Sequence, residues 1–242
     1  MNSQTIDYIL RSRKTILSIL AKRKYDTKPY EKFGYEEVEA MVKGGSTALR
    51  MDLTRPADST DTAIVNCRVE YAGNKLKTGG TSTGLDGLVS RLLGEEEEIK
   101  KKTNAAAEAQ KTSQDSEKID PTTTEVIVLL MADTFPLSDS FHAKALREWN
   151  THKLRISFFL MDNLVNNPAE HVLVPKHERV PTQEHEKVLG QNYILKKQQL
   201  PWIVFHVDIQ ARILGLIPGD IVKITRPSAT AGYYTEYRVC AP

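Results

Sequence analysis

The segment that most constrains the fold of this chain is Glu125–Met131, which reads EVIVLLM. Six of its seven residues are apolar, and three of those six are β-branched. A run of this length and content is typical of a strand that is buried on both faces of a sheet. Such a strand needs hydrogen-bonding neighbours, so the sequence predicts a sheet with Glu125–Met131 near its centre.

Further elements flank this strand on both sides. Ser138–Ser140 offers N-caps for a helix that runs through Trp149, and Leu154–Met161 supplies another strand. Thr62–Tyr71 alternates imperfectly between polar and apolar residues, which predicts a half-buried strand. Strand, helix and strand joined by short connections predict an α/β (α+β) domain whose sheet also takes up Thr62–Tyr71.

A helix is predicted at the N-terminus, because apolar residues recur there at spacings of three, four and seven. These residues are Ile6, Ile9, Leu10, Ile16, Leu17 and Leu20. The other face and the residues just after it are basic, namely Arg11, Arg13, Lys14, Lys22, Arg23 and Lys24. These cations either contact phosphate oxygens or form an ordinary solvated face of the helix, and the pattern leaves both interpretations open. A second helix is predicted over Tyr35–Val42, ended by Gly44-Gly45.

Net charge and cysteine content exclude several classes of protein. The 242 residues include 33 basic and 31 acidic side chains, and a net charge of +2 excludes nucleic-acid binding by bulk charge alone. No apolar run approaches the roughly 18 residues of a membrane span, so we expect no membrane insertion. The N-terminus has no basic leader followed by an apolar core, and we expect an intracellular protein. Cys67 and Cys240 are too few for a disulfide framework or a four-cysteine zinc site, so we expect buried or terminal thiols.

Residues 72–122 differ in character from the rest of the chain. They are rich in glycine and contain the charge runs Glu95–Glu98 and Lys100–Lys102. Such a segment has too little apolar surface to offset its ordering entropy. We therefore expect a mostly disordered insertion, with at most a short amphipathic turn around Leu88, Leu92 and Leu93.

A break at Asn166–Pro168 predicts a division into a domain over 1–169 and a small module over 170–242. The elements predicted in the small module are a strand at 171–175, a short helix from 181, a helix at 209–214 capped by Asp208, and a hairpin of strands 221–226 and 233–239. Leu200–Ile203 is too apolar for an ordinary surface, and it fits either a core or an interface. The module should thus be a small mixed sheet that ends in a β-hairpin.

Patterns that would carry catalysis are weak in this sequence. The glycine-rich Gly79–Gly84 is not followed by Gly-Lys-Ser/Thr, the six histidines form no His-Glu-x-x-His, and no serine has a nucleophile elbow around it. We expect no catalytic residue, no metal and no cofactor. Glu70 with Asp133 is the pair that a metal-dependent nuclease would have to use, and that activity stays as an alternative.

The C-terminal module carries a dense pattern of residues in a fixed order. They are His171, Leu173, Val174, Pro175, Lys176, His177, Gln199, Leu200, Pro201, Asp208, Ala211, Arg212, Gly215, Leu216, Pro218, Gly219, Asp220, Val222, Lys223, Ile224, Arg226, Ser228, Thr230, Ala231, Gly232, Tyr237 and Arg238. This pattern closely resembles the fifth subunit shared by eukaryotic nuclear RNA polymerases I, II and III, whose C-terminal half corresponds to a small subunit of the archaeal polymerase. The first 169 residues are similar in plan to the jaw domain of that family, a three-layer-like arrangement of a small sheet and helices. The family's Asp-Pro is Asp208-Ile209 here, which should only loosen the preference for a helix start.

The resemblance implies a non-catalytic assembly subunit of a DNA-dependent RNA polymerase. It implies docking on the largest subunit through the C-terminal module, and sequence-independent contact of the jaw domain with downstream double-stranded DNA. The docking candidates are Lys176, His177, Leu200, Pro201, Arg212, Arg226, Ser228, Tyr237 and Arg238. The DNA-proximal candidates are the six basic residues from Arg11 to Lys24, and Gly215, Gly219 and Gly232 are structural.

Several alternatives remain open beside this interpretation. The cationic side chains at Lys176, Arg212, Arg226 and Arg238 either form ion pairs within the module or reach a partner's carboxylates. The protein could come from a cellular lineage, with a nuclear location, or from a large DNA virus, with a virion or cytoplasmic factory. An adaptor that works off the polymerase is the remaining alternative.

Overall fold

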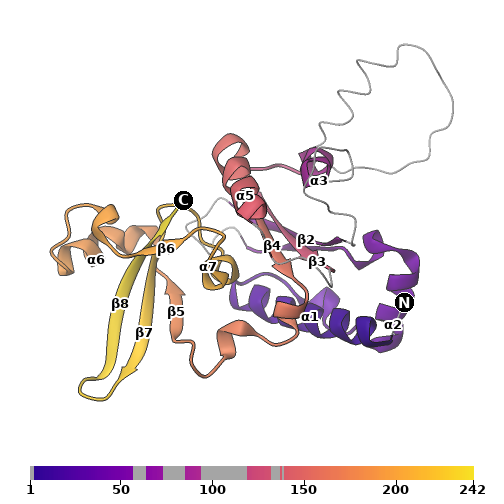
Figure 1. The fold of residues 1–242 in the computed structure, drawn as a ribbon, viewed down its shortest axis with the longest axis horizontal. Helices are drawn as coiled ribbons and strands as arrows, with labels where there is room; N and C mark the ends of the chain where they lie inside the picture. Colours follow the sequence, from indigo (N-terminus) through magenta and orange to yellow (C-terminus); the bar gives the residue numbers. More distant parts are fainter. Residues whose placement is uncertain (1–2, 57–63, 73–84, 94–118, 132–136, 138) are drawn as a thin grey trace, which may run out of the picture.

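The structure is a computed structural model that describes residues 3–56, 64–72, 85–93, 119–131, 137 and 139–242. These residues form two four-stranded sheets (Figure 1). The first sheet has the order β1-β2-β3-β4, with bounds β1 Met51–Thr54, β2 Asn66–Ala72, β3 Thr124–Leu130 and β4 Arg155–Leu160. The second has the order β5-β7-β8-β6, with bounds β5 Lys176–Arg179, β6 Trp202–Val204, β7 Ile221–Ser228 and β8 Gly232–Ala241.

Helices cover both faces of the first sheet (Figure 1). The helices are α1 Ser3–Lys22, α2 Tyr35–Gly44, α3 Leu85–Leu93 and α5 Asp139–His152. Successive side chains of a strand point to opposite faces. Accordingly Ile127 and Leu129 pack with the core under α1, whereas Val126 and Val128 pack with the core under α5. The expected three-layer arrangement and the α+β class are therefore confirmed.

The two middle strands of this sheet are buried on both faces. Every residue of β3 is buried, as predicted from its apolar run. The prediction of a half-buried strand at Thr62–Tyr71 is wrong for β2, in which five of seven residues are buried. The physical reason is its position, because β2 pairs antiparallel with β1 on one side and parallel with β3 on the other. The short strand β1 has no signal of its own in the sequence and forms through this pairing.

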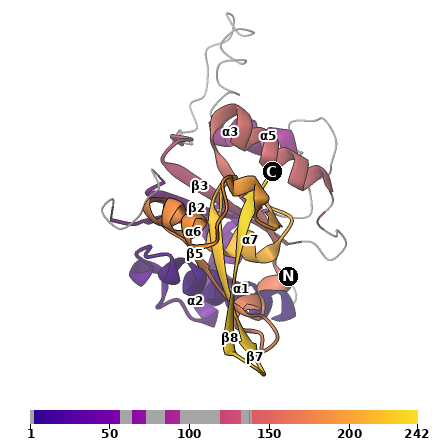
Figure 2. The same ribbon diagram turned by 90° about the vertical axis from the view of Figure 1, so that its left-hand side faces the viewer.

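Residues 170–242 form the C-terminal module, with helices α6 His185–Gln191 and α7 Ile209–Leu214. The predicted helix over Ile209–Leu214 is confirmed at both ends: Asp208 Oδ1 accepts a hydrogen bond from the Gln210 N–H at 2.7 Å, and Gly215 ends it with a φ of 78°. The predicted hairpin is confirmed as β7 and β8, which extend away from the first sheet (Figure 2).

The predicted strand at His171–Pro175 is wrong. Residues 171–174 form a turn, closed by the Val174 N–H to the His171 carbonyl at 2.9 Å, and β5 begins only at Lys176. The antiparallel register of β5 and β7 places Lys176 opposite Thr225. An earlier start would bring the strand opposite Pro227, which has no N–H to donate.

Short 3-10 helices make up several connections. They are η1 Lys28–Tyr30, η2 Ser46–Leu49, η4 Asp162–Leu164, η5 Pro168–Glu170, η6 Thr182–Glu184 and η7 Lys197–Gln199. The predicted second helix is confirmed as α2, which ends at Gly44 and is capped by Gly45 with a φ of 101°. The helix predicted from residue 181 is confirmed as η6 followed by α6.

Most of the predicted disordered insertion at 72–122 lies outside the described residues. Within it, α3 is a helix of nine residues rather than the short turn expected. Leu85, Val89 and Leu92 are buried in the same core as Phe141 of α5. In the described part of the chain, no helix has the length and apolar content to cross a membrane.

The hydrophobic core under α5 is shared by the two sheets. Phe158 of β4 and Phe141 of α5 belong to the same buried cluster as Ile203, Leu216 and Cys240 of the C-terminal module. Packing is thus continuous across the break predicted at residues 166–168. The division into domains at that point stays a prediction.

Candidate interaction surfaces and the joint between the sheets

Two side chains of the C-terminal module form hydrogen bonds with the main chain of Phe158 in β4, an edge strand of the first sheet. The Phe158 N–H donates to Nε2 of His206 at 2.9 Å, and the Phe158 carbonyl accepts from Nη1 of Arg212 at 2.6 Å. An edge strand otherwise leaves such groups unpaired and open to another strand. His206 and Arg212 therefore fix the module to the sheet and close part of its edge.

A buried cluster of charges lies next to this joint. Arg155 of β4 donates from Nε to the Leu216 carbonyl at 3.1 Å and forms an ion pair with Glu125. Arg23 Nη2 binds the other Glu125 oxygen at 2.5 Å. Burial disfavours the charged carboxylate, but the two guanidinium groups outweigh it and lower the pKa of Glu125 to about 2. The Glu125 carboxylate thus links Arg23, just after the C-terminal end of α1, to Arg155, the first residue of β4.

Glycine is required where α7 ends against this cluster. Gly215 has a φ of 78°, and a Cβ at this position would lie 2.4 Å from Nη2 of Arg23. The other two predicted structural glycines, Gly219 and Gly232, have φ values of 95° and 71°. All three therefore adopt the left-handed conformation that a side chain disfavours, as the turn pattern predicted.

A pair of histidines joins α5 to the module. His142 Nδ1 and His206 Nδ1 are 2.7 Å apart. Because His206 Nε2 accepts from the Phe158 N–H, its proton lies on Nδ1 and is donated to His142. Burial, followed by the nearby charge of Arg212, lowers the pKa of His206 to about 2. The two hydrogen bonds of His206 are therefore made with both imidazole rings neutral.

The structure removes two residues from the predicted docking set. Arg212 is buried at the joint, and Leu200 is buried in the core of the C-terminal module with Val188 and Val239. Their assignment to a partner surface is wrong, because the chain's own core covers both side chains.

The other docking candidates lie at or near the surface of the module. Lys176 forms an ion pair with Glu178 at 2.6 Å, and Glu236 pairs with both Arg226, at 3.4 Å, and Arg238, at 2.9 Å. These contacts agree with the internal-pairing alternative. Pro201 is exposed, whereas His177, Ser228 and Tyr237 are half-buried. Their contact with a partner stays a prediction.

The predicted basic face of α1 is wrong for two of its six residues. Arg13 is 2% exposed, donates to the Leu49 carbonyl at 3.1 Å and lies over the ring of Tyr30. Its spacing from Ile9 and Ile16 is the same as that of the apolar stripe, and this spacing would have predicted its burial. Arg23 is held by Glu125.

Four basic residues of α1 and the turn after it stay exposed, in two groups. Arg11 and Lys14 lie in the middle of the helix, and Arg11 pairs with Asp7 at 3.0 Å. Lys22 and Lys24 lie at its C-terminal end.

Most of the large exposed apolar side chains among the described residues belong to the C-terminal module. Among the described residues, nine of the ten large exposed hydrophobic side chains follow residue 170. They are Val172, Leu173, Tyr193, Leu195, Trp202, Val204, Val207, Tyr233 and Tyr234. The segment Leu200–Ile203, which fitted either a core or an interface, contributes to the core through Ile203, which is buried. Trp202 of the same segment is 64% exposed and available to an interface. Their alternation follows from the two-residue period of β6.

The described residues give no support to a metal site. They contain no group of three or more His, Cys, Asp or Glu side chains that could hold a metal ion. Glu70 pairs with Arg91 at 2.9 Å, and Asp133, its proposed nuclease partner, lies outside the described residues. Cys67 and Cys240 are buried thiols, as expected, and burial raises the pKa of Cys240 to about 12.

Together these features define a class of protein. A three-layer domain is fixed through buried side chains to a C-terminal module that carries nine of the ten large exposed apolar side chains among the described residues. This is the architecture of a subunit that assembles with other proteins.

Comparisons with known proteins identify the family. A family model described as RNA polymerase Rpb5, C-terminal domain, matches residues 166–240. The chain is 30% identical over 238 residues to the Dictyostelium discoideum protein named DNA-directed RNA polymerases I, II, and III subunit rpabc1, with 98% of this chain and 99% of that protein covered. It is 44% identical over 87 residues to the Caenorhabditis briggsae protein of that name, covering 36% of this chain and 40% of the relative. It is also 46% identical over 72 residues to the archaeal DNA-directed RNA polymerase subunit Rpo5 of Sulfurisphaera tokodaii, covering 30% of this chain and 83% of the relative.

The chain belongs to the family of the Rpb5 (RPABC1) subunit of DNA-directed RNA polymerases. It is a non-catalytic polymerase subunit, and its partners include other subunits of the polymerase. The expected family is thus confirmed. These three relatives are cellular proteins, and the viral alternative finds no support among them.

Proposed function

We propose that the C-terminal module docks this subunit on the largest polymerase subunit, while the N-terminal domain forms part of a jaw beside downstream DNA. The observation that carries the docking role is that nine of the ten large exposed apolar side chains among the described residues belong to the module. By analogy with eukaryotic relatives, the assembled protein acts in the nucleus.

The strand β6 is the centre of the proposed docking surface. It is an edge strand, pairing only with β8 within the described sheet, and it presents Trp202 and Val204 outward. Tyr193 and Leu195, between α6 and η7, add two nearly fully exposed side chains. Tryptophan and tyrosine are enriched among the residues that dominate binding energies at protein interfaces.

The test is co-purification of the full chain with the largest subunit, because the shared core makes the isolated module an unsuitable probe. Trp202→Glu with Val204→Glu should weaken the complex by about tenfold or more, the loss expected when an interface anchor is replaced by a charge. Tyr35→Glu on α2 is the matched control and should leave the complex intact. Normal co-purification of the double variant would refute docking through β6.

The proposed jaw contact uses Arg11 and Lys14, which are exposed on α1. Contacts of such side chains with phosphate oxygens carry no sequence information and weaken with salt. Arg13 takes no part in the proposal because it is buried.

A further inference from the structure

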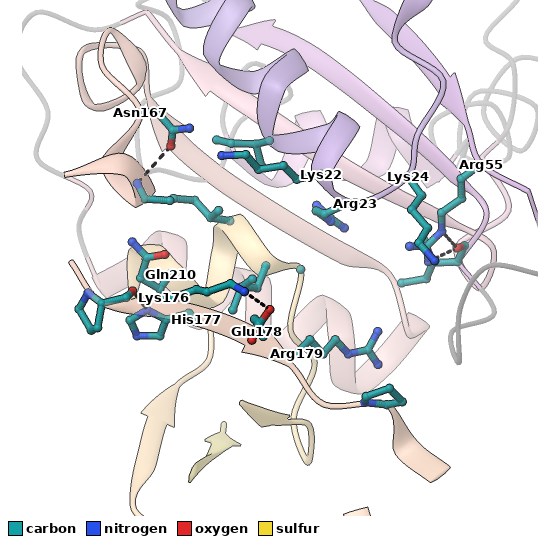
Figure 3. Close-up of a pocket in the computed structure, with 18 of the residues that line it drawn as sticks. Lys22, Arg23, Lys24, Arg55, Asn167, Lys176, His177, Glu178, Arg179 and Gln210 are labelled. Carbon is teal, nitrogen blue, oxygen red and sulfur yellow. Dashed lines mark hydrogen bonds and ion pairs between the residues drawn. The ribbon is translucent and has the colours of Figure 1, made fainter. Parts of the chain in front are cut away.

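A basic cleft of about 830 Å³ lies between the end of α1, the helix α7 and the strand β5 (Figure 3). In Figure 3 the side chains of Lys22 and Arg23 come from one side, those of Lys176 and Arg179 from the other, and Gln210 from α7. The charged residues that line it are Lys22, Arg23, Lys24, Arg55, Lys176, Glu178 and Arg179. Six cations and one carboxylate line the cleft, and Glu125 and Asp220 pair with two of these cations. The positive charge that remains at the rim attracts an anionic ligand.

The cations at the rim are held by contacts that a ligand can replace. Lys22 pairs with Glu170 at 2.7 Å, and Lys176 pairs with Glu178 at 2.6 Å. All four of these side chains are well exposed. Exposed ion pairs contribute little to stability, so a ligand carboxylate can take the place of either glutamate at small cost.

Polar atoms deeper in the cleft lack acceptors. Gln210 is 7% exposed, and its Nε2 has no hydrogen-bond partner among the described residues. Nη1 of Arg23 is likewise buried without an acceptor in the described part of the chain. A buried donor without an acceptor costs free energy, so a rotation of the Gln210 amide toward a main-chain carbonyl of a bound peptide is favourable.

Apolar side chains also line the cleft. The apolar surface open to a ligand comes from Leu214 of α7 and from Pro175 and Pro181, which flank β5. Ile19 and Ile213 lie behind it and are at most 6% exposed. A concave apolar surface with a cationic rim fits an extended peptide that alternates carboxylate and apolar side chains. A DNA duplex offers phosphates on a convex surface and no apolar side chain to fill the space.

We propose that this cleft binds an acidic peptide segment of a partner protein, with carboxylates over Lys22 and Lys176 and an apolar side chain against Leu214. The site is separate from the docking surface on β6 and does not depend on it. It also assigns the C-terminal group of basic residues on α1 to a protein ligand rather than to DNA.

The test measures binding of a fluorescent peptide that alternates aspartate and leucine to the full-length purified chain. Lys22→Glu with Lys176→Glu should weaken binding by about tenfold or more, because both rim charges then repel the ligand. Lys43→Glu on α2, outside the cleft, should leave the affinity unchanged. An oligo-aspartate of equal charge should bind more weakly than the alternating peptide, since it has no apolar side chain.

Three results would overturn the proposal. They are absence of peptide binding to the unaltered chain, equal loss in the Lys43→Glu variant, and tighter binding of a short DNA duplex than of the peptide through Lys22 and Lys176. Unfolding curves of the variants separate loss of the site from loss of the fold, since exposed lysines contribute little to stability. A failure of docking on the largest subunit would leave these measurements unaffected.

Discussion

Arg212 donates a hydrogen bond from Nη1 to the main-chain carbonyl of Phe158 at 2.6 Å, and so ties a helix of the C-terminal module to the edge strand of the first sheet. The same phenylalanine donates its N–H to His206 of the module. A main-chain site that normally recruits another strand is thereby used to join two parts of one chain. The relative position of the N-terminal domain and the module is set by buried polar contacts as well as by packing.

Replacing Arg212 by Met should destabilise the chain by about 2–3 kcal/mol, because the Phe158 carbonyl loses its charged donor and stays buried. Urea unfolding of the purified protein measures this change. The matched control is Arg226→Met, which removes an exposed arginine and should change the free energy of unfolding by less than about 0.5 kcal/mol. Equal effects of the two substitutions would contradict the role of Arg212.

Replacing Gly215 by Ala should cost about 3 kcal/mol or more. The new Cβ would meet Nη2 of Arg23 and displace it from Glu125, and the positive φ adds strain. Gly190→Ala in α6 is the control, since a Cβ there meets nothing within 4 Å, and it should be neutral or stabilising by up to about 1 kcal/mol. Thermal unfolding of both variants checks the difference, and a Gly215→Ala protein as stable as the parent would refute the packing argument.

Acidification should weaken the joint through His206. Its pKa is lowered to about 2 in the folded chain from an ordinary value of 6.5, so the unfolded chain binds more protons between these values. Stability is therefore full above pH 6.5 and falls as the pH is lowered, by up to about 1.4 kcal/mol per pH unit for this histidine.

The check is the free energy of unfolding measured between neutral and mildly acidic pH. In His206→Asn the slope of the free energy of unfolding against pH should correspond to about one proton fewer taken up on unfolding, since Asn does not titrate. Asn also tolerates the positive φ of this position. An unchanged slope in His206→Asn would show that other groups cause the pH dependence.

Local signals predict those elements whose ends are set by their own residues. Asp208 and Gly215 bound α7 because a capping carboxylate and a left-handed glycine act within one turn of the helix. The strands β1 and β6 escape prediction because four and three residues are too few for a pattern. They are strands because β2 and β8 supply their hydrogen bonds.

The predicted surfaces are less accurate than the elements, because burial depends on contacts distant in sequence. In the sequence, Arg23 stands in the middle of a basic run that predicts an exposed side chain. Its partner Glu125 lies on β3, 102 residues away. Arg212 reads as an exposed charge, and its acceptor is the main chain of Phe158, which a residue pattern does not reveal. Because the neighbours of Trp202 are also apolar, the sequence does not tell whether its side chain is buried or exposed. The structure decides this, since the alternation of β6 places Trp202 on the exposed face.

Arg11 and Lys14 carry the proposed jaw contact. In a polymerase assembled with the Arg11→Glu, Lys14→Glu variant, retention of downstream DNA should weaken, and the slope of log affinity against log salt should fall by about two, one unit for each lost phosphate contact. The subunit should stay in the complex, because neither side chain is buried and β6 is untouched. Lys187→Glu, which reverses one exposed charge on α6, is the control and should change neither quantity. DNA retention that is the same in the variant and the control at every salt concentration would show that this face of α1 does not approach DNA.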